Sequence, residues 1–111
     1  MSELLLKELK NIKDIPGLYI GCISLVALNY FILGYSVKEY QIEGENQKLI
    51  VNLREFESFI RKTYQLEGGA KGYATLISEI SKNDEEAFHK FFELLEEYLG
   101  KSLEEYTNGL S

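Results

Sequence analysis

The chain has 111 residues and 12.8 kDa, the size of one domain, and its 45% hydrophobic content places it outside the disordered class. A single cysteine, Cys22, excludes an internal disulfide, and with one histidine it excludes zinc clusters of Cys and His ligands, which indicates a cytoplasmic chain without a cofactor or metal. The net charge of −6 disfavours nucleic-acid and anionic lipid partners and favours a basic protein partner.

The first predicted element is a short, peripheral helix over residues 3–12. Ser2 is a good N-cap, strong helix formers follow it, and Pro16 and Gly17 stop the helix. Residues 17–23 contain two glycines and are predicted as a loop, although an extended conformation is also compatible with their sequence.

Residues 15–37 are 23 positions without a charge, which is long enough for a membrane-spanning helix. Pro16 and Gly17 at the start, and Asn29 near the middle, instead favour a break followed by a shorter buried helix. A membrane-associated protein anchored by residues 15–37 therefore stands as the alternative interpretation.

A long helix is predicted over residues 24–41, with Ser24 as its N-cap. Its apolar residues leave little polar surface, so we expect this helix to run through the centre of the fold. Gly34 is expected to allow a neighbouring element to approach closely.

Two further helices are predicted in the middle of the chain, separated by a glycine-rich connection. The first covers residues 52–65, begins at the N-cap Asn52 and carries aromatic residues at helical spacing. The second covers residues 72–81, where Tyr73, Leu76 and Ile77 share one face.

The most strongly amphipathic helix is predicted over residues 84–99. Asn83 or Asp84 caps it, and Gly100 is placed to end it before a tail at 101–111, whose start is expected to form one more turn. One face carries the apolar residues, and the opposite face is mostly acidic; the apolar set is Phe88, Phe91, Phe92, Leu95 and Leu99. Together these elements predict an all-α fold, an irregular bundle of four to five helices around an aromatic core that includes Phe31, Phe56, Phe59, Tyr73, Phe88, Phe91 and Phe92.

No pattern in the chain is typical of an enzyme. The single histidine, His89, is predicted on the solvent face of the helix over 84–99. A catalytic pair in which His89 activates Cys22 as a nucleophile is therefore not expected. Glu86 and His89 match one half of a di-metal motif of helical bundles, but the second half is missing from the sequence. Residues 68–72 lack the spacing of a phosphate-binding loop.

The acidic residues are concentrated near the end of the chain. Residues 84–105 carry eight acids and two lysines, and eight minus two accounts for the whole net charge. A solvated helix face is one explanation, and a surface that recognises a basic protein is the other. The candidate contact residues for such a partner are Glu86, His89, Glu93, Glu96 and Glu97, with Tyr98 and Tyr106 as neighbouring aromatic anchors.

Several aromatic motifs carry a family resemblance over residues 16–99. They are Leu18-Tyr19-Ile20-Gly21, Phe31-x-x-Gly34-Tyr35, Phe56-x-x-Phe59, Tyr73-Ala74-x-x-Ile77 and Phe88-x-x-Phe91-Phe92. In these motifs the chain resembles small helical immunity proteins that Gram-positive bacteria encode beside polymorphic secreted toxins. Tryptophans common in that family are replaced here by Phe59 and Tyr73.

The resemblance implies a protein that neutralises a cognate toxin by stoichiometric binding, without catalysis. An acidic helix face would suit a toxin with a basic surface, since opposite charges speed association. A helical regulatory adaptor with another protein partner is the remaining alternative.

Overall fold

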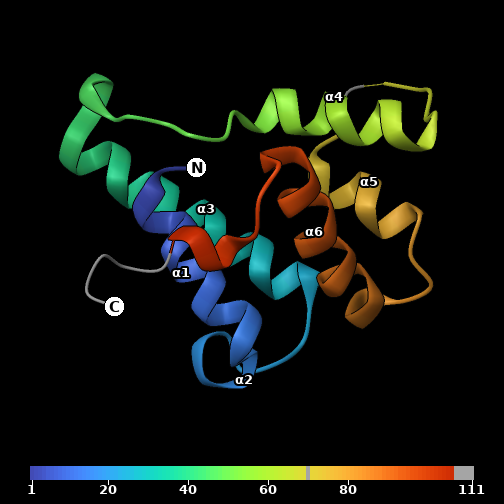
Figure 1. The fold of residues 1–111 in the computed structure, drawn as a ribbon, viewed down its shortest axis with the longest axis horizontal. Helices are drawn as coiled ribbons and strands as arrows, with labels where there is room; N and C mark the ends of the chain where they lie inside the picture. Colours follow the sequence, from blue (N-terminus) through green and yellow to red (C-terminus); the bar gives the residue numbers. More distant parts are fainter. Residues whose placement is uncertain (70, 107–111) are drawn as a thin grey trace.

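The computed structural model describes residues 1–69 and 71–106, and within these ranges every regular element is helical (Figure 1). The all-α fold predicted from the sequence is therefore confirmed. In chain order the elements are α1 (Glu3–Asp14), α2 (Pro16–Tyr19), α3 (Leu25–Glu43), the 3-10 turn η1 (Gly44–Asn46), α4 (Leu53–Tyr64), α5 (Tyr73–Glu79), α6 (Asp84–Leu99) and the 3-10 turn η2 (Leu103–Tyr106).

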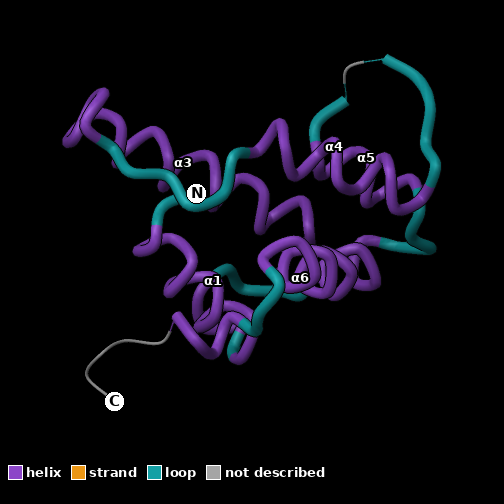
Figure 2. The backbone as a smooth tube through the Cα atoms, turned by 45° about the horizontal axis from the view of Figure 1, so that its top comes forward, coloured by secondary structure: helices purple, strands orange, loops and turns teal. Residues whose placement is uncertain are grey.

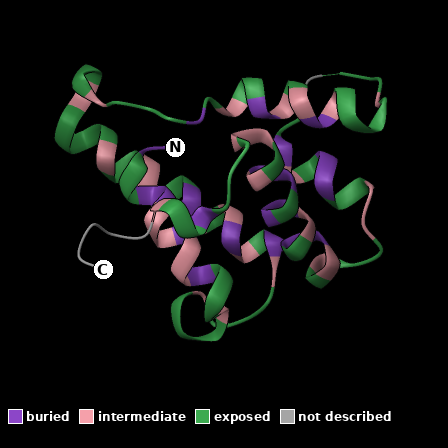
Figure 3. Ribbon diagram, in the orientation of Figure 1, coloured by how far each residue is buried: buried purple, intermediate pink, exposed green. Residues whose placement is uncertain are grey.

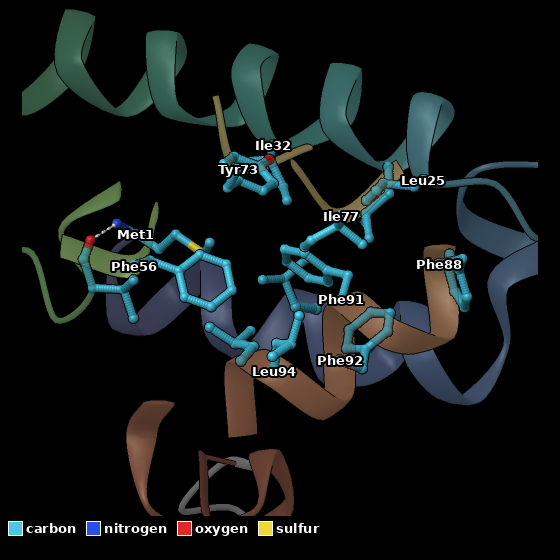
Figure 4. Packing of buried hydrophobic residues seen from close by; sticks show 14 of the residues in the cluster. Met1, Leu25, Ile32, Phe56, Tyr73, Ile77, Phe88, Phe91, Phe92 and Leu94 are labelled. Carbon is cyan, nitrogen blue, oxygen red and sulfur yellow. Dashed lines mark hydrogen bonds between the residues drawn. The ribbon is translucent and has the colours of Figure 1, made fainter. Parts of the chain in front are cut away.

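The core is built on three aromatic rings from three helices. Phe56 of α4, Tyr73 of α5 and Phe91 of α6 contact one another, with ring centroids 5.7 to 6.0 Å apart (Figure 4). The Tyr73 hydroxyl donates a 2.6 Å hydrogen bond to Asn29 of α3, so its polar end is satisfied at the edge of the core. Burial raises the pKa of Tyr73 far above its ordinary value. Phe31 and Phe59 pack against this core but are only partly buried.

Helix α1 is part of the core, and the expectation that it is peripheral is wrong. Leu5, Leu6, Leu9 and Ile12 are completely buried, and α1 packs against η2, α2 and α3. The Ser2 hydroxyl accepts a hydrogen bond from Leu5 N–H, which confirms the predicted N-cap.

The uncharged segment 15–37 is broken, as its glycines and proline predict. Pro16 starts the single turn α2, bends follow through residue 23, and α3 begins only at Leu25 (Figure 2). Residues 17–23 are therefore a turn of helix and bends, with no extended strand. In the part of the chain that the structure describes, no helix has the length and apolar character needed to cross a membrane.

Helix α3 lies in the core only through its first half. Leu25, Leu28 and Ile32 are completely buried, whereas the apolar residues on its other side are exposed (Figure 3). The expectation that the whole helix runs through the centre is therefore wrong, because no element of the described ranges covers one apolar face of α3. Gly34 is also exposed, and no atom lies within 4 Å of the position that a Cβ would occupy there.

The chain between α3 and α4 returns along the side of α3 (Figure 1). At its end, the Ile50 and Val51 N–H groups donate to the Met1 carbonyl at 2.9 and 3.1 Å, which fixes this segment next to the start of α1. Asn52 then caps α4 as predicted, because its side-chain oxygen accepts from the N–H groups of Arg54 and Glu55.

The apolar face of α6 is buried as its pattern predicts, with Phe88, Phe91 and Leu95 fully covered. Asn83 rather than Asp84 is the N-cap, and Gly100 ends the helix in the left-handed conformation at φ +73°. The predicted turn after it is present as η2, whose Leu103 is buried against α1. The rest of the predicted tail, residues 107–111, lies outside the described residues.

Candidate protein-binding surface

Glu86 forms hydrogen bonds at the start of α6. Asn83 accepts a 2.8 Å hydrogen bond from Glu86 N–H, and the Glu86 carboxylate in turn accepts from Lys82 N–H at 2.7 Å. These two hydrogen bonds satisfy one N–H group in the first turn of α6 and one just before the N-cap. Glu86, a predicted contact residue, therefore helps to fix the beginning of α6.

Asp84 joins the beginnings of α6 and α3. Its carboxylate accepts from the N–H groups of Leu25 and Val26 at 3.0 and 3.1 Å, and it also accepts from the Ser24 hydroxyl. A carboxylate is favoured at a helix N-terminus, where the N–H groups and the helix dipole are both positive. This contact joins two helices whose first residues lie about 60 positions apart in the sequence.

Glu96, another predicted contact residue, turns toward the molecule. Its carboxylate accepts from Leu103 N–H at 2.7 Å, from Lys13 Nζ at 3.0 Å and from the Ser102 hydroxyl at 3.2 Å. Burial by itself raises the pKa of Glu96, but these hydrogen bonds and the Lys13 charge outweigh it and hold the pKa below its ordinary value. Glu96 therefore connects α6 to α1 and η2.

The three remaining predicted contact residues, His89, Glu93 and Glu97, are exposed. With Glu85 they recur every four residues along α6, so they form one continuous row on its surface, here named the α6 stripe. The row is about 18 Å long at the helical rise of 1.5 Å per residue. Among the described residues, none makes an ion pair with the carboxylates of the α6 stripe.

The neighbouring side chains that the structure describes do not neutralise the charge of the α6 stripe. Lys90, the only lysine of α6, lies over the ring of Tyr64 on α4, 5.6 Å from its centroid. The His89 ring packs edge-on against Phe88, with centroids 5.3 Å apart. The α6 stripe can therefore present three carboxylates and one imidazole to a basic protein surface.

The predicted aromatic anchors are not free beside the α6 stripe. Tyr98 packs against Phe56 and Phe59 at 5.5 Å, and its hydroxyl donates to Glu55 at 3.3 Å. Tyr106 lies under the Lys101 ammonium, 4.2 Å from the ring centroid. Both tyrosines are therefore held by contacts within the chain.

The most exposed aromatic residues among the described residues are on α3, and they were not among the predicted contacts. Tyr30 and Tyr40 are 70% and 60% exposed. A signal for them exists in the sequence, because α3 carries a second set of apolar residues at helical spacing beside the buried set.

The structure also shows where Cys22 lies and how the metal-ligating residue types are distributed. Cys22 is exposed in the bend between α2 and α3. In residues 1–69 and 71–106, no group of three or more histidine, cysteine, aspartate or glutamate side chains has the geometry to hold a metal ion.

Compared with protein-family models, curated proteins and solved structures, the chain gives no match.

Proposed function

We propose that this chain is an immunity protein that binds a cognate secreted toxin in the cytoplasm of the producing cell and neutralises it by stoichiometric association. The observation that supports this function best is the α6 stripe, in which His89, Glu93 and Glu97 are exposed on a helix fixed at both ends. The resemblance of the aromatic motifs to immunity proteins points to the same function.

Charge complementarity is the physical basis of the proposed binding. A row of carboxylates attracts a basic surface over roughly one Debye length, about 8 Å at physiological salt, and so increases the rate of productive encounters. Because the side chains are exposed, salt weakens their contribution, and the affinity should fall as ionic strength rises.

The five predicted contact residues divide into two roles in this proposal. His89, Glu93 and Glu97 contact the toxin, since their side chains are exposed and make no hydrogen bond or ion pair in the described chain. Glu86 and Glu96 act from within, because their hydrogen bonds hold the two ends of α6 in place.

Charge reversal of the α6 stripe tests the proposal. The double variant Glu93→Lys with Glu97→Lys should weaken binding to the product of the neighbouring reading frame by about tenfold or more at low salt, because two attractions become repulsions. Its melting temperature should stay close to that of the wild type, since both side chains are exposed. Titration calorimetry at two salt concentrations measures the affinity.

The matched control changes the same charge elsewhere. Glu45 and Glu67 are exposed acids outside α6 without an ion pair in the described chain, so Glu45→Lys with Glu67→Lys alters the net charge equally. This control should bind within about twofold of the wild type. Equal losses in both double variants would show a general effect of net charge, and unchanged affinity in both would place the interface away from the α6 stripe.

A further inference from the structure

Five exposed apolar side chains form a regular row along α3. They are Val26, Tyr30, Leu33, Val37 and Tyr40, here named the α3 seam, and their exposed fractions range from 47% to 70%. Their spacing of four, three, four and three residues is the 3.5-residue repeat with which one helix packs along another. At 100° per residue the α3 seam lies roughly 130° around the helix from the buried Leu25, Leu28 and Ile32.

Three adjoining pockets form a groove along the α3 seam, and their lining also includes the charged residues Arg54, Glu57 and Glu79. Near Val26 and Tyr30 the opposite wall is α5, with Ala74 and Thr75. Near Leu33 the wall passes to Leu53 at the start of α4. Beside Val37 and Tyr40 the groove widens against the returning segment 47–54, where its volume is about 610 Å³. The distance from Val26 to Tyr40 is about 20 Å along the helix, which fits four turns of an occupying helix.

Five of the six helix positions that flank the α3 seam are small or neutral. Ala27, Gly34 and Gln41 lie on one side of it, and Asn29, Ser36 and Glu43 lie on the other. Nothing within 4 Å surrounds the position that a Cβ would take at Gly34, so a neighbouring helix can approach the backbone there. Glu43, the last residue of α3, is the one carboxylate at these flanking positions, so two copies facing each other along this helix would oppose little charge there despite the net charge of −6.

We propose that the α3 seam is the interface of a homodimer, in which two copies pack seam against seam about a twofold axis. A helix with the same 3.5-residue repeat and few charges beside it fits the groove, and α3 of a second copy is such a helix. The seam exposes on the order of 500 Å² of apolar surface, at the upper end of patches found on monomers. Stable interfaces bury roughly 800 Å² per partner, so the dimer must also cover the groove walls, which include Leu49, a residue that is 54% exposed.

The dimer does not depend on the proposed immunity function. The α3 seam and the α6 stripe lie on different helices and share no residue. Either surface can therefore be disrupted by substitution without altering the other.

Sedimentation equilibrium tests the dimer. The wild-type chain should reach twice the mass of one 12.8 kDa chain as its concentration rises toward roughly 200 µM. Leu33→Glu should shift the monomer-dimer equilibrium by at least about tenfold toward monomer, because it places a carboxylate in the centre of an apolar contact. Circular dichroism should show the same helix content as the wild type, because Leu33 is about half exposed.

The matched control is Ile42→Glu. Ile42 is 71% exposed on the same helix but on its other side, so this change adds the same charge and should leave the dimer intact. A wild-type chain that stays monomeric at the highest concentration overturns the proposal. A dimer that survives Leu33→Glu, or that dissociates equally in both variants, also overturns it.

Chemical cross-linking locates the interface independently. In a Cys22→Ser background, which removes the exposed native thiol, Leu33→Cys should cross-link two chains through a short bismaleimide. Leu33 is the middle residue of the α3 seam, so a twofold axis through the seam brings both copies of it together. Ile42→Cys should give no cross-linked dimer above background. Equal cross-linking at the two positions, or none at Leu33→Cys, would contradict the proposed interface.

Discussion

At the scale of single residues, two acids of α6 act as connectors between elements. Asp84 accepts hydrogen bonds at the start of α3, and Glu96 accepts them from η2 and from Lys13 of α1. Both belong to the eight acids of residues 84–105, but their carboxylates form hydrogen bonds with other parts of the protein. Their role in stability can be separated from that of exposed acids beside them.

Replacing Asp84 by alanine should lower the free energy of unfolding by about 1 to 2 kcal/mol, because two N–H groups at the start of α3 lose a charged acceptor. Glu85 is the matched control, since it is the next residue on the same helix and is exposed. Glu85→Ala should change the stability by less than about 0.5 kcal/mol. Urea unfolding followed by circular dichroism measures both, and equal losses would contradict the connecting role of Asp84.

Replacing Glu96 by glutamine should have an effect that depends on pH. In the folded chain the pKa of Glu96 is lower than its ordinary value, so the ionised form stabilises the fold above the unfolded-state pKa of about 4.3. That contribution is lost as the pH falls through the lowered folded-state pKa. Glu96→Gln should therefore cost about 1 kcal/mol near neutral pH, because a charged acceptor is lost.

Unfolding measured from neutral pH down to about pH 3 checks this dependence. The gap between wild type and Glu96→Gln should stay constant above about pH 5 and close at the acid end. The neighbouring Glu97→Gln, at an exposed position, should show no comparable gap at any pH. A gap that widened on acidification would contradict the assigned hydrogen bonds.

The sequence could predict that the acidic residues at 84–97 share one helix. It could not predict which of their carboxylates form hydrogen bonds within the protein. The partners of Asp84 and Glu96 lie 59 and 83 residues away, at Leu25 and Lys13, so they are set by tertiary packing. His89, Glu93 and Glu97 were placed on the solvent face by periodicity alone, and they are exposed.

At the scale of elements, α1 and α3 show where a local pattern is insufficient. The pattern of α1 correctly predicts a helix and its cap, yet it does not show what covers its leucines. The covering surfaces come from α3 and from η2, near the far end of the chain. The apolar residues of α3 form two faces, and the packing of α1, α5 and α6 determines which of them is buried.

The burial of α1 gives a direct prediction of stability. Leu9→Ala should cost about 2 to 5 kcal/mol, the range for removing a fully buried leucine side chain. Leu4→Ala removes the same atoms from the same helix, but Leu4 is 56% exposed, so its cost should be below about 1 kcal/mol. Thermal unfolding of both variants measures the difference, and similar costs would mean that α1 is peripheral.

At the scale of the whole molecule, the order of the helices follows from local signals. Ser2, Ser24, Asn52 and Asn83 each accept a hydrogen bond from an N–H group of the helix that follows, and Gly100 ends α6. Capping and termination depend on neighbouring residues, which is why the sequence predicts them well. The arrangement of the helices depends on contacts between distant segments, and the groove beside α3 arises from that arrangement.

The two proposed surfaces together define an expected assembly. A dimer joined at the α3 seam would leave the α6 stripe of each chain available, because the two surfaces share no residue. One toxin should then bind per chain, giving two toxins per dimer. Light scattering of the purified complex measures this ratio.

The most direct test of the proposed function is co-purification of the tagged wild-type chain with the product of the neighbouring reading frame, washed at low and then at high salt. We predict an equimolar complex at low salt that loses its partner as the salt is raised, together with loss of toxin activity in the bound state. Failure to recover the partner even at low salt, or a bound toxin that keeps its activity, would contradict the immunity function.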